Sequence, residues 1–374
     1  MRIGIEAQRL FRPKKHGVEI VALELIKHLQ QTDKENEYFV FVKEDVDDTC
    51  ILPTENFQII KLPSASYPLW EQWLLPRALK QYKLDVLHCT ANTAPLFPGV
   101  RTVITLHDVI FMESVNFKGT AYQNFGNLYR RAIVPRVAKR NELVTVSDYE
   151  RYNIANALNT STERIQVVHN GVSPVFAPVT DTAALAVIRE KYSLPDHFIL
   201  FFANPAPKKN TPNALAAFAW YCRQHPESTV KLVITDSSKT YIRQKISELK
   251  IEDILPRLQI MDYIAYTDLP YVYTLATLYL YPSLRESFGL PLLEAQSCGT
   301  PVITSNVSCM PEIAGDAAIF ADPLDPEGIG RAIAGALHDP AQTAGLYEKG
   351  ISNARRYSWT AAAKKMRTIY ETAL

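Results

Sequence analysis

Short apolar runs alternate with longer amphipathic stretches along the chain, and this alternation is the first structural signal in the sequence. Residues 2–7 and 38–42 are apolar runs of strand length, whereas the apolar side chains between Val18 and Leu29 recur at helical spacing. The same alternation predicts further strands at 57–62, 86–89, 102–106, 143–146, 165–169, 198–203, 231–235, 258–261, 278–281, 302–304 and 317–320. Strands that alternate with helices favour an α/β fold with mostly parallel, doubly wound sheets.

The alternation is interrupted between residues 172 and 182, a stretch with two prolines and little periodicity. We interpret this stretch as a linker between domains. It predicts two Rossmann-like domains, residues 1–172 and 173–357, facing a cleft, with the C-terminal helix 358–374 as a candidate to pack back on the first domain. A chain of 374 residues is long enough for two separate cores.

Composition narrows the class of protein. With 47% hydrophobic residues, 21% charged residues and a net charge of +1, nothing indicates nucleic acid as the main partner. Five scattered cysteines without a CxxC pair favour a reducing compartment and argue against a zinc site or a disulfide framework. The N-terminus begins with a predicted strand and no long apolar run follows, so we expect a cytoplasmic protein without a membrane span.

The stretch 281–312 holds the most informative chemistry. Glu286 and Glu294 lie eight residues apart and flank Gly289 and Pro291, which favour a helix start. Amide groups at a helix start attract phosphate, and carboxylates accept hydrogen bonds from sugar hydroxyls. The pattern therefore predicts a cradle for a nucleotide sugar, although the spacing alone would also suit two solvated charges.

Two further stretches follow predicted strands. Lys208 and Lys209 lie in a proline-stiffened loop, where they would neutralise a leaving diphosphate, or else form an ordinary polar surface loop. His107 and Asp108 end a strand, where the imidazole would contact a sugar hydroxyl or a phosphate oxygen unless it is a structural histidine.

Three weaker signals remain. Gly17, within His16-Gly17-Val18, would admit a phosphate or an acceptor, but no GxGxxG is present. The only DxD, at Asp45 and Asp47, lies in an acidic run and is better read as a solvated turn than as a metal site. A basic helix and a nearby helix with two tryptophans suggest contact with an anionic membrane surface, or solvated arginines and core tryptophans; the residues are Arg130, Arg131, Arg136, Lys139, Arg140, Trp70 and Trp73.

The segment from Glu286 to Glu294, ESFGLPLLE, resembles the E-x7-E motif of the retaining glycosyltransferases of family 4 (glycosyl transferases group 1), which have the GT-B fold. Further similar segments occur in the family's order along nearly the whole chain: Ser147-Asp148, residues 168–172, residues 207–210 and residues 311–317. The resemblance implies that Glu286 binds the donor sugar, that Glu294 binds the ribose and that Lys209 stabilises the departing phosphate. It also implies that residues 1–172 form the acceptor-side domain and residues 173–357 the nucleotide-sugar donor domain. Donor contacts would come from Phe288, Gly289 and Leu290, with His107 near the donor sugar and Gly17 near the donor phosphate and the acceptor.

One departure from the family pattern concerns the phosphate. The family often has an arginine five or six residues before the lysine, where this chain has Asn204 and Ala203. Either Lys208 supplies the second positive charge or the leaving group is less well neutralised.

These observations predict a metal-independent glycosyltransferase without a cofactor that moves a mannose- or glucose-type hexose, with retention, to a hydroxyl of a glycan or lipid-linked acceptor. We expect a role in cell-surface polysaccharide or lipopolysaccharide assembly, with peripheral contact at the inner membrane surface. Three alternatives stay open: a nucleotide-sugar isomerase, a sugar phosphorylase, and a non-catalytic nucleotide-sugar sensor.

Overall fold

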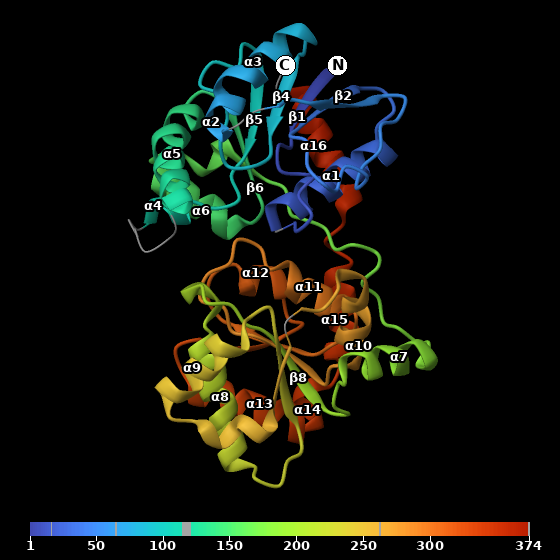
Figure 1. The fold of residues 1–374 in the computed structure, drawn as a ribbon, viewed down its shortest axis with the longest axis vertical. Coiled ribbons are helices and arrows are strands. Elements are labelled where there is room, and N and C mark those ends of the chain that lie inside the picture. The colour runs from blue at the N-terminus through green and yellow to red at the C-terminus, as the bar shows by residue number, and fades with distance from the viewer. Residues whose placement is uncertain (16, 64–65, 114–120, 262, 373–374) are drawn as a thin grey trace. The chain divides into compact units, whose positions relative to one another are not determined.

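The computed structural model describes residues 1–15, 17–63, 66–113, 121–261 and 263–372. The chain divides into two compact units (Figure 1). Unit 1 consists of Met1–Gly171 with Ser358–Leu374, and unit 2 consists of Val172–Tyr357. Both are α/β units built around one parallel sheet.

Unit 1 holds a seven-stranded parallel sheet in the order β3-β2-β1-β4-β5-β6-β7. Its strands are β1 (Arg2–Glu6), β2 (Glu37–Val42), β3 (Phe57–Lys61), β4 (Val86–Cys89), β5 (Arg101–Thr105), β6 (Glu142–Thr145) and β7 (Ile165–Val167). Nearly all side chains of the inner strands are buried, as expected for a parallel sheet covered on both faces. The predicted strands of this half are confirmed within a residue or two.

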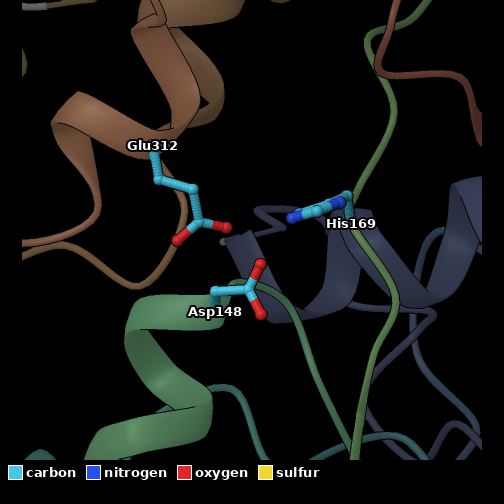
Figure 2. Close-up of side chains that lie close together, drawn as sticks. All are labelled: Asp148, His169 and Glu312. Carbon is cyan, nitrogen blue, oxygen red and sulfur yellow. The ribbon is translucent and has the colours of Figure 1, made fainter.

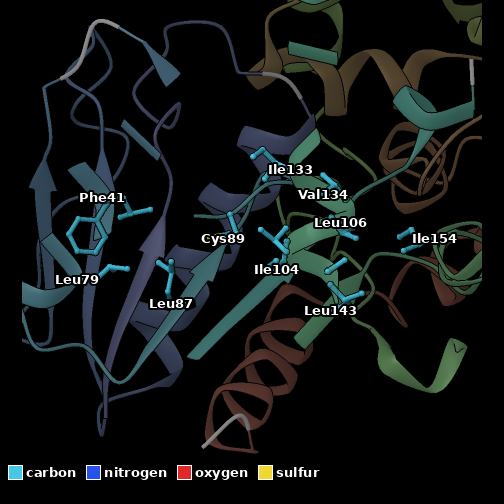
Figure 3. Close-up of a cluster of buried hydrophobic side chains, with 14 of the residues drawn as sticks. Phe41, Leu79, Leu87, Cys89, Ile104, Leu106, Ile133, Val134, Leu143 and Ile154 are labelled. Carbon is cyan, nitrogen blue, oxygen red and sulfur yellow. The ribbon is translucent and has the colours of Figure 1, made fainter. Parts of the chain in front are cut away.

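The described helices of unit 1 connect these strands. They are α1 (Gly17–Thr32), α2 (Tyr67–Leu69), the π-helix Trp70–Leu74, α3 (Leu75–Gln81), α4 (Ile110–Glu113), α5 (Ala121–Ala138), α6 (Asp148–Leu158), the 3-10 turn Thr162–Arg164 and α16 (Trp359–Thr372). Ser147 and Glu150 have the sequence spacing of a capping box, and the cap at the start of α6 is present, because the Ser147 hydroxyl accepts from the Glu150 amide. Figure 3 shows part of the apolar core against the sheet, including Phe41, Leu87 and Cys89.

Helix α16 completes unit 1, although it is the last described helix of the chain. It packs against α1, and its Trp359, Met366 and Ile369 are buried. The buried Tyr370 hydroxyl shares a hydrogen bond of 2.8 Å with Nδ1 of His88 on β4. Sequence-distant segments therefore form a single core.

Unit 2 holds a six-stranded parallel sheet in the order β10-β9-β8-β11-β12-β13. Its strands are β8 (Phe198–Phe202), β9 (Lys231–Thr235), β10 (Leu258–Ile260), β11 (Leu278–Tyr281), β12 (Val302–Ser305) and β13 (Ile319–Ala321). Both sheets follow the doubly wound order in which the first strand lies beside the fourth. That adjacency is the switch point, where ligands bind beyond the carboxyl ends of the strands.

The helices of unit 2 include two that the periodicity does not predict, α7 and α12. The described helices are α7 (Thr182–Tyr192), α8 (Thr211–Gln224), α9 (Lys239–Leu249), α10 (Leu269–Leu275), α11 (Leu290–Ser297), α12 (Met310–Ala314), α13 (Pro326–His338), α14 (Pro340–Thr343) and α15 (Leu346–Ala354), with 3-10 turns at Pro207–Lys209, Glu252–Arg257 and Tyr266–Asp268. Helix α7 is amphipathic only weakly, since Ile188 alone is buried. Residues 341–356 read in the sequence as one continuous helix, but this prediction is wrong, because Gly345 at φ +75° separates α14 from α15.

Candidate active site

The switch point of unit 2 brings together the two stretches that the sequence singles out. Lys209 follows β8, Glu286 follows β11, and these two strands are neighbours in the sheet. The Lys209 Nζ lies 2.6 Å from Glu286 Oε1 and 3.5 Å from the Tyr281 hydroxyl. A cation and a carboxylate at one switch point can face the phosphate and the hydroxyls of one ligand.

The Glu286 carboxylate is kept ionised by its surroundings. Burial would raise its pKa, but the positive charges of Lys209 and Lys208 outweigh burial and lower it. A carboxylate that stays ionised is a strong acceptor for hydroxyl groups.

The backbone of Glu286 is also fixed. Its amide donates to the Ser308 Oγ at 3.0 Å, and the same hydroxyl donates to the Glu286 carbonyl at 2.8 Å. Ser308 has a φ of +61°, which indicates a tight turn that aims its hydroxyl at this loop. Sequence reasoning missed Ser308, and no spacing rule would single it out.

Gly289 caps the start of α11 with a φ of +93°, as the sequence predicts for a glycine at that point. The backbone conformation favours glycine, and a Cβ there would lie 2.8 Å from the Met310 Cε, so the end of the Met310 side chain would have to shift to admit any other residue. Phe288 is buried and Leu290 is the first residue of the helix. The start of α11 thus lies directly after the Glu286 loop, with amides available to an anion.

Glu294 lies in the second turn of α11. Its Oε2 accepts from the Tyr273 hydroxyl at 3.3 Å. Burial raises the Glu294 pKa to about 7, against the opposing effect of that hydrogen bond. At neutral pH Glu286 is therefore ionised, whereas Glu294 is partly protonated.

Asn210 joins the lysine loop to the glutamate loop. Its Nδ2 donates to the Pro282 carbonyl at 2.9 Å and to the Pro323 carbonyl at 2.7 Å. The residue adopts φ +58° at the start of α8, a conformation that asparagine tolerates. Sequence reasoning missed this role, although an asparagine that ends a proline-rich loop before a helix is a recognisable signal.

A second cation is available beside Lys209. Lys208 acts on Glu286 through its charge, and the Lys208 carbonyl accepts from the Leu284 amide at 2.8 Å. Arg285, which sequence reasoning also missed, donates to the Glu286 carbonyl at 3.3 Å. The positions of the family's arginine, Ala203 and Asn204, hold no charge.

In unit 1, His107 is buried beyond the end of β5. Its Nε2 lies 2.8 Å from the Thr90 carbonyl, and because a carbonyl only accepts, Nε2 carries the proton. Burial lowers the pKa of His107, so the ring is neutral at pH 7. With Nε2–H committed to a carbonyl, the ring has a lone pair on Nδ1 that suits a hydroxyl better than a phosphate oxygen.

The sequence also singles out Gly17, Asp47 and Trp70 in unit 1. Gly17 begins α1, and a Cβ there would meet nothing within 4 Å, while His16 lies outside the described residues. Asp47 of the DxD, predicted to lie in a solvated turn, pairs with Lys15. Of the two tryptophans, Trp70 is buried and donates to the Leu62 carbonyl at 3.0 Å.

Figure 2 shows Asp148 on the first turn of α6 and His169 after β7, two residues from segments that carry the family resemblance. A carboxylate oxygen and a ring nitrogen of this pair lie within 4.8 Å of each other. They follow the neighbouring strands β6 and β7. No helix in the described part of the chain is both long and apolar enough to cross a membrane.

Comparisons with known proteins identify the family. Residues 15–176 match the model of Glycosyltransferase Family 4, and residues 187–357 match the model of Glycosyl transferases group 1. The chain is 28% identical over 296 residues to the O-antigen chain mannosyltransferase B of Escherichia coli, covering 78% of this chain and 74% of that protein. It is 26% identical over 267 residues to the serotype-specific mannosyltransferase WbdA of the same organism, but spans only 32% of WbdA.

Solved structures agree on the fold. The structure of HepE from Anabaena in complex with UDP and glucose superimposes with a TM-score of 0.74 at 17% identity and covers 100% of both chains. The two sheets, the family models and the named relatives lead to one conclusion. The chain belongs to the family 4 type of glycosyltransferases and has the GT-B fold.

Proposed function

We propose that the protein transfers a hexose, mannose first among the candidates, from a nucleotide-diphosphate sugar to a hydroxyl of a glycan or lipid-linked acceptor in cell-surface polysaccharide assembly. The observation that carries this is the pair of Lys209 and Glu286 at the switch point of unit 2, next to the start of α11. The similarity to an O-antigen mannosyltransferase supports mannose as the sugar.

Each of the site residues of unit 2 binds a different part of the donor in this proposal. Lys209, assisted by Lys208, meets the diphosphate and stabilises the charge that develops as the sugar leaves. Glu286 accepts from hydroxyls of the sugar, and Glu294 accepts from the ribose. Two lysines provide the positive charge at the phosphate, so the proposed reaction uses neither a metal nor a cofactor.

The proposed reaction retains the anomeric configuration. The bond between C1 and the phosphate oxygen breaks, the acceptor oxygen bonds to C1 on the same face, and the acceptor proton passes to the leaving phosphate. Glu286 is bound to Lys209 rather than free to attack C1, which supports a positioning role for it. An NMR spectrum of the product that shows inversion would contradict this route.

The donor is tested with the purified protein and a panel of GDP-, UDP- and ADP-hexoses. We expect one nucleotide sugar to raise the melting temperature most, because only a ligand of the folded state stabilises it. Transfer to an acceptor distinguishes the proposed enzyme from the alternatives. Turnover that needs free phosphate would indicate a phosphorylase, product without acceptor an isomerase, and binding without turnover or donor hydrolysis a sensor.

We further propose that unit 1 touches an anionic membrane surface. Exposed apolar side chains lie on three segments: α2 with the π-helix after it, the loop between β4 and β5, and α5. Gln72 of the π-helix connects them, because its Nε2 amide group donates to the Ala94 carbonyl in the loop and to the Tyr129 hydroxyl on α5. The exposed side chains are Leu69, Trp73, Phe97, Phe125 and Leu128. Basic residues of α5 and the following turn lie in the same part of the chain. Apolar side chains beside basic ones suit an interface of anionic lipid.

Sedimentation with vesicles tests the membrane contact. We expect binding to vesicles that contain phosphatidylglycerol and weaker binding to phosphatidylcholine alone. Trp73, which is 59% exposed, is the side chain to change, and Trp73→Ala should reduce binding. Equal binding of both proteins to both lipids would contradict the proposal.

A further inference from the structure

Unit 1 has a switch point of its own, between β1 and β4, and a small pocket opens there. Glu6, the last residue of β1, lines the pocket together with Arg9, Glu19, Tyr67 and Thr90. Its volume is about 20 Å³, which is room for one water-sized group. The pocket thus matches a single polar group of a ligand rather than a whole sugar ring.

The Glu6 side chain is only 1% exposed and is incompletely paired. Its Oε1 accepts from the Gln8 amide at 3.1 Å, whereas its buried Oε2 has no hydrogen-bond partner among the described residues. An unpartnered buried acceptor lowers folding stability, because the hydrogen bonds that it makes to water in the unfolded chain are not replaced. A ligand that donates to Oε2 would recover that loss on binding.

Another buried glutamate of unit 1 shows what a purely structural carboxylate looks like. Glu71 accepts from the Tyr67 hydroxyl at 2.9 Å and from Thr93 on Oε1, and from Gln72 at 2.8 Å and Tyr129 on Oε2. The fold therefore surrounds one carboxylate with four side-chain donors. Glu6 receives hydrogen bonds from backbone amides alone, those of Gln8 and Thr90, and from no side chain among the described residues, which sets it apart from Glu71.

The charges around the pocket favour a neutral group that both donates and accepts. Arg9 stacks on the Tyr67 ring at 5.4 Å and supplies a donor, while the Thr90 hydroxyl is committed to the Glu6 carbonyl at 2.7 Å. Glu19, on α1, lies 3.8 Å from Arg12. Two nearby carboxylates disfavour a phosphate, and the guanidinium of Arg9 disfavours a cation. An alcohol hydroxyl fits both partners.

Electrostatics agree with this geometry. Burial, and to a smaller extent the charge of Glu71, raise the pKa of Glu6 to about 7, although the Gln8 amide and Arg9 act in the opposite direction. Near neutral pH the side chain exists in both forms, and each form can hydrogen-bond a hydroxyl.

We propose that Glu6 and Arg9 form a subsite that binds one hydroxyl group of the sugar acceptor and thereby selects among acceptors. The proposal rests on the proposed function, because it assigns unit 1 the acceptor of the same reaction. A site built to hydrogen-bond a hydroxyl discriminates strongly against an analogue that lacks it, because its buried polar group is then left unpaired. The subsite therefore determines which hydroxyl-bearing sugars are accepted.

The test measures binding by saturation-transfer NMR with methyl α-D-mannopyranoside, the methyl glycosides of glucose and galactose, and the monodeoxy derivatives of each. In the wild-type protein, we expect removal of one particular hydroxyl to weaken binding about tenfold or more, as for a hydrogen bond to a charged group. In Glu6→Ala the same deoxy derivative should bind as well as its parent. Glu6→Gln, which keeps the side-chain shape, covers the case in which Glu6→Ala does not fold.

The control is Asp33→Asn, which changes a buried carboxylate of unit 1 whose donors include Asn36 and the Tyr38 hydroxyl. This variant should retain the discrimination between parent and deoxy sugar even where it loses stability. Equal discrimination in wild type and both Glu6 variants, or no glycoside that loses affinity when Glu6 is changed, would overturn the proposal.

Donor binding separates this inference from the proposed function. Nucleotide sugars should raise the melting temperature of wild type and of Glu6→Gln alike, since the donor residues lie in unit 2. If no nucleotide sugar binds or is transferred, the proposed function fails, while hydroxyl discrimination at Glu6 remains measurable as binding alone. If the donor is bound and transferred but the discrimination is independent of Glu6, only the subsite fails.

Discussion

At the scale of single residues, the two glutamates of the donor stretch show how similar side chains acquire different properties. Glu286 is paired with Lys209 and has a lowered pKa, whereas Glu294 has one tyrosine donor and a pKa raised to about 7. The sequence spacing treats them as a symmetrical pair. Their different surroundings suggest different tasks, which two substitutions can separate.

Lys209→Ala should mainly slow turnover. Loss of one cation that stabilises charge in the transition state typically lowers kcat by about 10²–10³. The Kd of the donor should change less, because Lys208 keeps a positive charge in the same loop. Steady-state kinetics together with calorimetric donor binding check this, and Lys208→Ala, with a smaller effect on kcat, is the matched control. Unchanged kcat in Lys209→Ala would exclude its assigned role.

The raised pKa of Glu294 predicts how donor affinity depends on pH. An ionised carboxylate accepts more hydrogen bonds from ribose hydroxyls than a protonated one, and Glu294 ionises near pH 7. Donor affinity should therefore rise between pH 6 and pH 8, and Glu294→Gln should flatten this rise. Calorimetry at both pH values is the measurement. An identical pH profile in the variant would show that another group controls donor binding.

The same raised pKa has a consequence for stability. Between the unfolded pKa near 4.5 and the folded pKa near 7, the folded state binds more protons than the unfolded state. The free energy of unfolding should therefore fall as pH rises through this window, with the contribution complete below pH 4.5. Denaturant titrations of wild type and Glu294→Gln at pH 5 and pH 8 check the sign. A larger fall in the variant than in wild type would be the opposite result.

At the scale of elements, the start of α11 is where the local sequence is most restrictive. Gly289→Ala should destabilise the protein by about 1–2 kcal/mol for the left-handed backbone alone, with an added cost for the contact with Met310. Gly99→Ala is the control, because Gly99 has φ +75° and nothing within 4 Å of the added Cβ. Chemical denaturation of both variants isolates the contact. An equal loss in both would mean that Met310 moves aside freely.

Much of the fold could be predicted from the sequence, and the exceptions have physical causes. The buried strands are recognisable because parallel strands covered on both faces read as continuous apolar runs. Helix α7 was missed because its apolar pattern is weak and only Ile188 is buried. The break at Gly345 was missed because a glycine within a helical pattern does not by itself reveal a positive φ.

The candidate site was predictable where chemistry follows local order, as for Lys209, Glu286 and Gly289. Ser308 and Asn210 were not, because their contacts join loops that only the sheet order brings together. Glu6 could not be predicted for another reason. It ends an apolar strand, and whether its Oε2 finds a hydrogen-bond partner depends on residues of α2 and of the loop after β4, which are distant in the sequence.

At the scale of the whole molecule, unit 1 depends on the last helix of the chain. Removal of residues 358–374 should expose the apolar surface that Trp359, Met366 and Tyr370 cover. We expect the truncated protein to lose the cooperative unfolding of unit 1 and to become sensitive to protease there. Unit 2 should still bind the nucleotide sugar, because the donor residues lie within it. Protection of unit 1 equal to that of wild type would contradict this prediction.

The return of α16 to unit 1 also bears on how the protein is made. A ribosome that adds about 5–20 residues per second completes all of unit 2 between the two segments of unit 1, an interval of roughly ten to forty seconds. During that time residues 1–171 lack the helix that packs on α1 and pairs with His88. The order of synthesis therefore leaves the first unit as the last to finish folding. Chaperones that hold exposed apolar surface would act on the nascent chain at this stage.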